Sequence, residues 1–313
     1  MGIKQLNKLI RHHTPLKTIN ISDLNGKTIV VDTMIYIYKF MANDSLLENI
    51  YLMCVLMRHH NITPIFIFDG DKPKEKRDEL NRRREQRREA WLKYDKLIAD
   101  SNENELNSTK VKKELTKLKR QCIKIKSHHI EEIKKLITFL GMNYIVAEGE
   151  ADQLCAELVI NKQADACMSD DMDLFVYGCP YVLRLFNISR KTTILYDLKN
   201  ILSYLNMSFE NFKIMCTLCG TDYNIEYNKH NIFKIYNKYN YYIKNVDTNK
   251  IKFLDWIIGE NQNYDKKCVC DTINMFNVNK CCKHKIVENN FLDRINLYKL
   301  LEKEFFLNPI EVY

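Results

Sequence analysis

The chain has 313 residues, of which 46% are hydrophobic and 28% charged, and its formal net charge is +8. This length is enough for one large domain, or one domain with appendages, around a substantial core. The sequence shows no run of membrane-spanning length and no secretion signal, and eleven cysteines in such a chain indicate reduced thiols, which argues against membrane proteins and disulfide scaffolds.

Residues 1–71 alternate helical and extended patterns. A helical start is followed by a strand that ends at Asp32, an amphipathic helix near residues 45–60 and a second strand that leads to Asp69. Strands separated by helices predict βαβ units. We therefore predict an α/β fold with a mostly parallel central sheet flanked by helices.

Residues 72–127 form a helical and strongly basic segment, which we expect to break near 101–109. Residues 72–88 hold nine Lys or Arg against four acids, and residues 110–126 add eight bases. A solvated charged helix is the ordinary explanation of such a run. Here the run begins directly after Asp69 and few apolar residues interrupt it, which favours contact with phosphate groups.

Residues 128–207 return to short β-rich runs, which predict strands at 143–147, 166–169, 181–186 and 192–196. The pattern over 208–245 is helical again. The C-terminal region, 246–313, gives no clear pattern apart from a group of cysteines.

Seven acidic residues stand at or just beyond the ends of apolar runs. In a parallel sheet the carboxyl ends of the strands meet at one edge, so these acids would converge and repel each other unless cations lay between them. Carboxylates suit Mg²⁺ or Mn²⁺, and two such ions suit phosphate chemistry. By spacing alone, Glu148 pairs with Glu150 as well as Asp152 does. The seven are Asp32, Asp69, Glu150, Asp152, Asp171, Asp173 and Asp222.

The motifs around these acids closely resemble the flap endonuclease family of structure-specific 5′ nucleases, the XPG/Rad2-like family. The resemblance covers roughly residues 1–225. It implies a PIN-like nuclease core in two parts, 1–71 and 128–207, an inserted helical arch over 72–127 and a helix-two-turn-helix DNA-binding module over 208–245. It also selects Asp152 over Glu148 as the metal ligand. The matching motifs are Met1-Gly2-Ile3-Lys4-Gln5-Leu6, Val31-Asp32-Thr33, Phe68-Asp69-Gly70, Glu150-Ala151-Asp152, Asp171-Met172-Asp173 and Gly220-Thr221-Asp222-Tyr223.

The same resemblance implies roles for further residues. Lys76 and Arg83 match the two basic arch residues that engage the scissile phosphate in the family. Tyr38 falls where the family stacks an aromatic ring on a base, although a buried core tyrosine explains it equally well. Arg184 also has a family match, with an open role. The predicted DNA contacts are Tyr38, Arg82, Arg84, Arg87, Arg184, Lys229, His230 and Lys234.

The segment 225–234 departs from the family pattern. The family has a glycine-containing hairpin that holds duplex phosphates and a monovalent ion, whereas this segment contains no glycine. Asn228 and Asn231 can take left-handed conformations, so the segment can still form a comparable turn. We expect the charges of Lys229, His230 and Lys234 to replace close backbone contact.

A cluster of cysteines and a histidine lies outside the family pattern. Five soft ligands within 17 residues are enough for a structural Zn²⁺ site. The spacing is not the usual one for zinc, and small apolar packing explains many cysteines of this chain, so packing is favoured. The cluster consists of Cys268, Cys270, Cys281, Cys282 and His284.

The resemblance implies a monomeric, metal-dependent nuclease that cleaves branched DNA, chiefly 5′ flaps, with 5′→3′ exonuclease activity, in replication, repair or recombination. A catalytically inactive DNA-binding scaffold and a PIN-type ribonuclease are the alternatives. We expect an intracellular protein, in the nucleus or at a cytoplasmic replication site, without a sliding-clamp peptide, because the required Gln is missing before Phe305-Phe306. The abundance of Ile, Asn, Lys and Tyr is typical of AT-rich genomes, such as those of large DNA viruses or protozoa.

Overall fold

A single seven-stranded sheet forms the centre of the protein. The computed structural model describes residues 2–71, 76–100, 108–224, 230–260, 264–278 and 291–303, and within them the strand order is β1-β7-β6-β5-β2-β3-β4. Neighbouring strands from β4 to β6 are parallel, whereas β7 is antiparallel to both β6 and β1. The predicted mostly parallel α/β fold is therefore confirmed. The strands are β1 (Lys17–Asn20), β2 (Thr28–Asp32), β3 (Thr63–Phe68), β4 (Asn143–Val146), β5 (Ala166–Met168), β6 (Tyr181–Asn187) and β7 (Thr192–Asp197).

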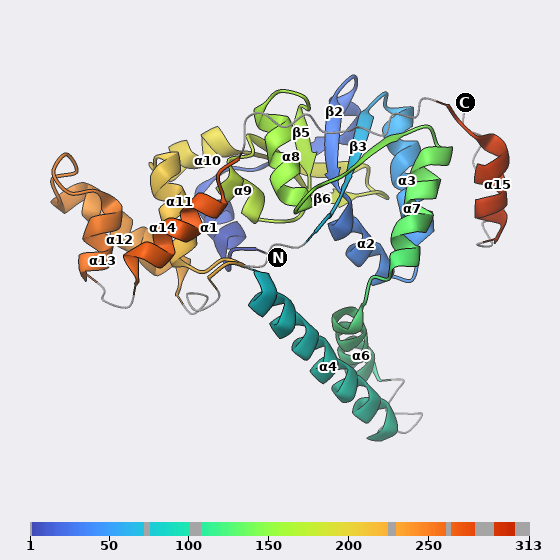
Figure 1. Cartoon of the computed structure of the whole chain (residues 1–313), viewed down its shortest axis with the longest axis horizontal. Coiled ribbons are helices and arrows are strands. Elements are labelled where there is room, and N and C mark those ends of the chain that lie inside the picture. The colour runs from blue at the N-terminus through green and yellow to red at the C-terminus, as the bar shows by residue number, and fades with distance from the viewer. Residues whose placement is uncertain are drawn as a thin grey trace.

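Helices cover both faces of the sheet (Figure 1). Successive strand residues point to opposite faces, so Val30 of β2 joins one apolar core and its neighbours Ile29 and Val31 join the other. The Val30 face packs against α1 (Leu6–His13), α8 (Ala151–Ile160), α9 (Asp173–Tyr177) and α10 (Leu198–Tyr204). The opposite face packs against α2 (Thr33–Met41), α3 (Leu46–His59), α7 (Ser127–Phe139) and α15 (Arg294–Lys303).

A group of helices extends the first core at one end of the sheet, and together they bury Phe212, Tyr239 and Phe253. The group consists of α11 (Phe209–Leu218), α12 (Ile232–Asn245), α13 (Phe253–Glu260) and α14 (Lys266–Met275). In Figure 1 it lies at the far end from α3, α7 and α15. None of the helices in the described ranges is long and apolar enough to cross a membrane.

Two helices project from the body as a separate arm (Figure 1). They are α4 (Arg77–Asp100) and α6 (Thr109–Cys122), which pack against each other. Charged side chains cover most of α4, and only Glu79 and Ala90 of this helix are buried. Both helices lie within the segment predicted to form the arch, so we call this pair the arch; most of the expected break at 101–109 lies outside the described residues.

Candidate active site

A chain of hydrogen bonds joins three of the acids at the ends of β2 and β5. Asp32 is the buried last residue of β2, and its Oδ2 accepts a hydrogen bond from Ser169 Oγ at 2.8 Å. Ser169 Oγ accepts from the Asp171 amide at 3.1 Å, and Asp171 Oδ1 accepts from the Asp173 amide at 3.0 Å. Because β2 and β5 are paired neighbours, these carboxylates lie together at the carboxyl edge of the sheet.

The start of α8 brings three further acids to the same edge. Asp69 directly follows β3, and its Oδ1 accepts a hydrogen bond from the amide of Ala151, the first residue of α8, at 2.9 Å. Glu150 is the N-cap of α8 and Asp152 lies in its first turn. The unpaired amides of a helix N-terminus favour negative groups, which lowers the cost of collecting carboxylates there.

Gly70 fixes the loop that precedes α8. Its amide donates to the carbonyl of Gly149 at 2.8 Å, and a Cβ at position 70 would overlap the carbonyl of Ala147. The loop held in this way leaves Glu148 exposed to solvent, whereas Asp152 is at least half-buried. The local structure therefore favours Asp152 over Glu148 as a member of the cluster.

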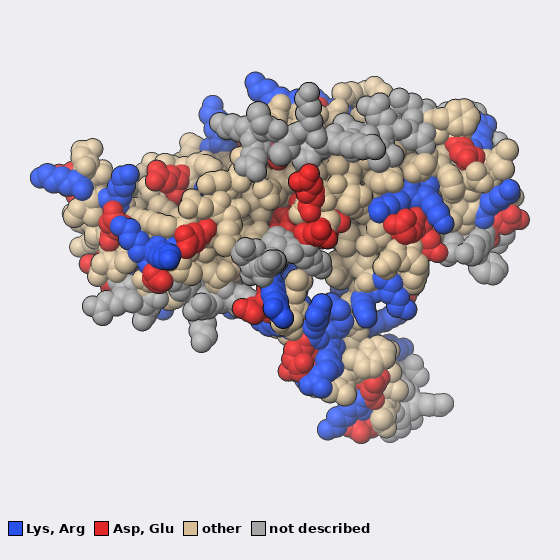
Figure 2. Space-filling model, in the orientation of Figure 1, with Lys and Arg blue, Asp and Glu red and all other residues tan. Residues whose placement is uncertain are grey.

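Two cations from the base of the arch reach into the acids. Lys76 Nζ lies 2.7 Å from Glu150 Oε1 and 3.6 Å from Asp222 Oδ2. A guanidinium nitrogen of Arg83 lies 2.7 Å from Asp222 Oδ2, while Arg83 Nε contacts Glu79 at 2.6 Å. Figure 2 shows a group of acidic side chains in the middle of this face, above the basic arch. The structure thus brings Lys76 and Arg83 together with the predicted metal ligands.

Burial makes the cluster unfavourable for bare negative charge. Burial, and next the charge of Asp69, raises the pKa of Asp32 to about 7. Burial also raises the pKa of Asp173 well above its usual value. Burial opposes the charge of Lys76, but the carboxylates around it, Asp152 foremost, outweigh this effect and raise its pKa. Cations beside Asp32 and Asp173 would therefore favour the charged forms of these two side chains.

The donor set fits a hard divalent metal ion. All seven side chains are carboxylates, which Mg²⁺ and Mn²⁺ prefer, and Asp173 Oδ1 is buried without a hydrogen-bond partner. Within the described residues, however, no group of three His, Cys, Asp or Glu side chains is already arranged around a metal position. The ammonium of Lys76 lies among the acids in this conformation, 2.7 Å from Glu150 Oε1.

Two tyrosines belong to the site although neither was predicted to be a site residue. Tyr223 OH donates to Glu150 Oε2 at 2.7 Å and lies 3.0 Å from Tyr177 OH, which is then the donor between the two. Lys76 Nζ lies 4.8 Å from the centre of the Tyr223 ring. The position of Tyr223 directly after Asp222 was the available signal, whereas Tyr177 had none.

Gly2 packs directly against two of the acids. Its φ of +73° is in the left-handed region, and a Cβ at this position would overlap the carboxylate oxygens of both Asp171 and Asp173. The segment before α1 therefore lies against the start of α9 and forms part of the wall of the site.

The structure gives the predicted DNA contact at Arg184 no support, because this residue is buried, with 5% exposure. Its guanidinium donates to Asn7 Oδ1 at 2.7 Å and to the carbonyl of Asp170 at 2.8 Å, and it lies over the Tyr196 ring. Arg184 therefore braces the loop that carries Asp171, which is a positioning role inside the protein.

Tyr38 lies on α2 at the entrance to the arch. Tyr38 is 36% exposed, so it is not a buried core tyrosine. It lines a hollow of about 570 Å³ between the body and the arch. Basic residues dominate the rest of that lining, which includes Arg83, Arg87, Lys93 and Arg120.

The remaining predicted DNA contacts differ in whether their charge is free to bind phosphate or is already paired within the protein. Arg82 donates to both carboxylate oxygens of Glu79, at 2.6 and 2.7 Å, whereas Arg84 and Lys234 are exposed. His230 packs on the ring of Tyr264, and burial lowers the pKa of this histidine, so it is a poor source of positive charge.

The turn before α12 is only partly described, since Asn228 and Lys229 lie outside the described residues. Asn231 does not take the left-handed conformation considered for it. Its φ is −93°, and its side-chain oxygen accepts a hydrogen bond from the Phe233 amide at 2.9 Å, which caps α12.

The predicted zinc cluster stays a prediction. Cys268 and Cys270 stand two residues apart on α14, so their side chains point to opposite sides of the helix. Cys268 packs against the core, and Cys270 lines a hollow of about 760 Å³ between α11, α13 and α14. The other three ligands, Cys281, Cys282 and His284, lie outside the described residues.

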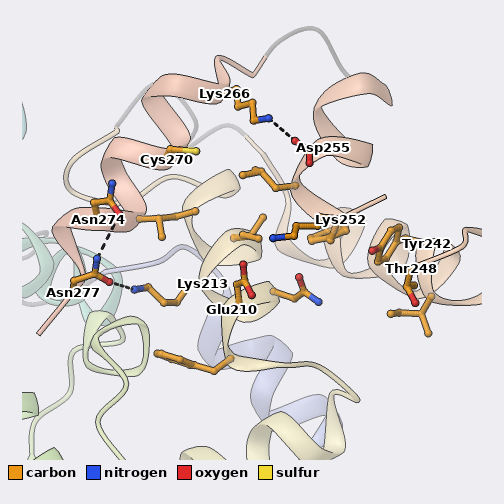
Figure 3. A pocket seen from close by; sticks show the side chains of 17 residues that line it. Glu210, Lys213, Tyr242, Thr248, Lys252, Asp255, Lys266, Cys270, Asn274 and Asn277 are labelled. Carbon is orange, nitrogen blue, oxygen red and sulfur yellow. Dashed lines mark hydrogen bonds and ion pairs between the residues drawn. The ribbon is translucent and has the colours of Figure 1, made fainter. Parts of the chain in front are cut away.

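The hollow beside α14 is larger than the one at the arch but lacks a cluster of acids (Figure 3). Several of its polar groups are already paired with each other. Lys266 contacts Asp255 at 2.6 Å, and Lys213 donates to Asn277 Oδ1 at 2.9 Å. Because these polar groups are already paired, the acidic edge of the sheet is the better candidate for the active site.

Known families match both halves of the nuclease core. Residues 1–90 match the model of the XPG N-terminal domain, and residues 141–222 match that of the XPG I-region. These two segments contain all seven acids together with Lys76 and Arg83.

Individual relatives and structures agree with these matches. Flap endonuclease 1 of Methanococcus aeolicus is 30% identical over 227 residues, which are 67% of this chain and 67% of that protein. Flap endonuclease 1 of Lodderomyces elongisporus is 30% identical over 244 residues, and the match spans 71% of this chain but only 61% of the relative. The catalytic core of Rad2 in complex with DNA substrate shares the fold, with a TM-score of 0.66, 19% identity and coverage of 97% of this chain and 95% of that one. The chain therefore belongs to the XPG/Rad2-like flap endonuclease family.

Proposed function

We propose that the protein is a metal-dependent, structure-specific 5′ nuclease that cleaves branched DNA, chiefly 5′ flaps, with 5′→3′ exonuclease activity. The observation that carries this proposal is the gathering of seven carboxylates at one edge of the sheet, directly beside a basic arch. Neither an inactive scaffold nor a PIN-type ribonuclease accounts for both a complete set of acids and a long arch.

We assign two Mg²⁺ or Mn²⁺ ions to the seven acids, where they would activate water and stabilise the leaving oxygen. Lys76 and Arg83 then contact the phosphate at the cleaved bond, because both side chains already reach the same carboxylates. Tyr223 and Arg184 position Glu150 and the Asp171 loop through the contacts described above.

In this proposal the arch and the α11–α12 region bind different parts of the substrate. The unpaired 5′ strand follows the basic arch, and the duplex rests beside α11 and α12, where Lys234 is exposed. The Rad2 complex with DNA substrate has the same fold, which supports DNA as the partner. Such an enzyme would act wherever DNA is replicated or repaired, in the nucleus or at a cytoplasmic replication site.

Cleavage assays on flap, nicked, gapped, bubble, four-way and RNA substrates with Mg²⁺ test the proposal. We expect cleavage near the branch of 5′ flaps, and none with a chelator. Asp171→Asn should slow cleavage by about 100-fold or more while flap binding persists, since even partners outside the ligand shell change metal-site activity 10- to 100-fold. Glu148→Gln is the matched control and should cleave normally, because Glu148 is exposed. Near-normal cleavage by Asp171→Asn, or preference for RNA, would refute the proposal.

A further inference from the structure

The arch carries an exposed tryptophan on an otherwise strongly charged helix. Trp91 of α4 is 54% exposed, and its ring stacks on Tyr94 with centroids 5.9 Å apart and planes inclined by 22°. The buried contacts of the arch involve other residues, Ala90 of α4 and Leu118 of α6. Packing within the arch therefore does not account for the open surface of the Trp91 ring.

Trp91 shares one face of α4 with two arginines. Residues four and seven apart lie on the same side of a helix, so Arg87 and Arg84 precede Trp91 along one stripe. Arg87 also lines the hollow at the base of the arch, together with Arg83 and Tyr38. Arg87 therefore links this stripe to the hollow, whose lining includes Arg83, the arginine that contacts Asp222 of the acid cluster.

The charge of the hollow that adjoins this stripe at Arg87 suits unpaired nucleic acid. Arg83, Arg87, Lys93 and Arg120 line the hollow against a single acid, Glu89. Proteins bind single strands by combining a cationic groove for the backbone with aromatic rings on which bases stack. An apolar partner such as a protein helix would not need this excess of cations, so charge favours a nucleic acid.

We infer that Trp91 is a stacking platform for a base of the unpaired 5′ strand, whose phosphates run along Arg84 and Arg87. The inference rests on the proposed function, because it takes the strand to follow the arch. At a rise of 1.5 Å per residue, Trp91 lies about 12 Å beyond Arg83 along the helix. Phosphates follow at about 3.4 Å or more along a strand, so this base lies within about four nucleotides of the cleaved bond.

Tryptophan fluorescence tests the contact without any cleavage. The chain has two tryptophans, and Trp256→Phe leaves Trp91 as the only one. We expect oligothymidine, added in a chelator, to quench this fluorescence with the same dissociation constant that anisotropy of a labelled oligonucleotide gives. An oligonucleotide that binds by anisotropy without quenching Trp91 would overturn the inference.

Substitutions separate stacking from charge. Trp91→Ala should weaken binding of a long 5′ flap about fivefold to tenfold and leave a flap-free nicked duplex unaffected, while Trp91→Phe retains most of the affinity. The salt dependence should stay unchanged, since no phosphate contact is lost, whereas Arg87→Ala should reduce it. Leu92→Ala is the matched control, because Leu92 is 59% exposed but lies on another face of α4. An equal loss in Leu92→Ala would contradict a specific platform.

The outcomes distinguish this inference from the proposed function. Quenching by oligothymidine in a protein that cleaves no flap would support the platform and refute only the nuclease activity. Normal cleavage by wild type, with no effect of Trp91→Ala on flap binding, would refute only the platform. If Trp91→Ala binds flaps normally but alters self-association in size-exclusion chromatography, the ring belongs to a protein interface and the inference is overturned.

Discussion

Three carboxylates of the site, Asp69, Asp32 and Glu150, are each oriented by a separate hydrogen bond. Asp69 accepts from the first amide of α8, Asp32 accepts from Ser169, and Tyr223 donates to Glu150. These bonds fix orientation but do not neutralise the charge, so the acids still repel each other. Lys76 and Arg83 supply part of the missing positive charge in this conformation.

The close packing of Gly2 leads to a prediction at this scale. Gly2→Ala should reduce flap cleavage by about tenfold to 100-fold while the melting midpoint changes little, because the new methyl group presses on the carboxylates of Asp171 and Asp173. Gly26→Ala is the control, since Gly26 also has a left-handed φ, of +72°, but no neighbour within 4 Å of an added Cβ. Similar cleavage by the two variants would show that crowding at the acids is unimportant.

Individual residues could be predicted only where a local pattern marked them. The seven acids stand at or just beyond the ends of apolar runs, and this pattern can be read directly from the sequence. Arg184 and Tyr177 gave no such signal, because their partners are far away in the chain: Asn7 lies 177 residues from Arg184, and Tyr223 lies 46 residues from Tyr177. The resemblance to the family suggested a DNA contact at Arg184, but only the folded structure shows that this residue is buried.

At the scale of elements, ion pairs hold the arch to the body in addition to the covalent connections of the chain. Lys76 directly precedes α4 and Arg83 lies in its second turn, and both contact acids that belong to the body. The same two side chains are the proposed phosphate contacts. Lys76 and Arg83 therefore have to give up some of their contacts with the carboxylates when they bind the phosphate of DNA.

This double role predicts the behaviour of Lys76→Ala. Cleavage should slow by about 100-fold, as for removal of one charge-stabilising donor, while flap binding changes only a few-fold. Trypsin should also cut the metal-free arch faster, because its anchor to Glu150 is gone. Arg88→Ala is the control, since Arg88 is exposed and pairs only locally with Glu85. A loss of binding as large as the loss of rate would place Lys76 in substrate binding alone.

Helices and strands with many buried apolar residues were easier to predict from the sequence than exposed or short ones. Strands β2 to β7 have mostly apolar runs and were predicted near their observed positions. Strand β1 was missed, because only Ile19 of its four residues is buried and it pairs with β7, about 175 residues later. Helices α13 to α15 were also missed, since they are short and lack a strong period.

For the molecule as a whole, the active site is a source of instability until cations arrive. Asp173 is 1% exposed, and its Oδ1 has no hydrogen-bond partner in the described structure. A buried charge without a close partner costs free energy, so a neutral side chain of the same shape removes that cost. Activity and stability therefore make opposite demands on this position.

Asp173→Asn should accordingly raise the melting midpoint of the chelator-treated protein by about 2–4 °C or more, and abolish cleavage. Mg²⁺ or Mn²⁺ should stabilise the wild type more than the variant, since the wild type binds the metal more tightly. Asp165→Asn is the control: it removes a surface pair with Lys27 and should not stabilise the protein. A lower midpoint for metal-free Asp173→Asn would contradict this account.

The overall architecture was the most predictable level, because the alternation of strands and helices constrains the topology strongly. The sequence could not predict the pairing of β1 with β7 or the closed contact between Lys76 and the acids. Both depend on the relative placement of segments far apart in the chain. The viral or protozoan source inferred from composition stays a prediction.

The position of β2 has a consequence for synthesis on the ribosome. This central strand pairs with β3 on one side, but its other edge stays open until β5 emerges, since Ile29 pairs with Ala166. A nascent or truncated chain that ends before β5 would expose an unpaired, apolar strand edge, a known route to aggregation. Such a fragment would also lack Asp171, Asp173 and Asp222. Interrupted translation should therefore yield an insoluble product rather than a partly active nuclease.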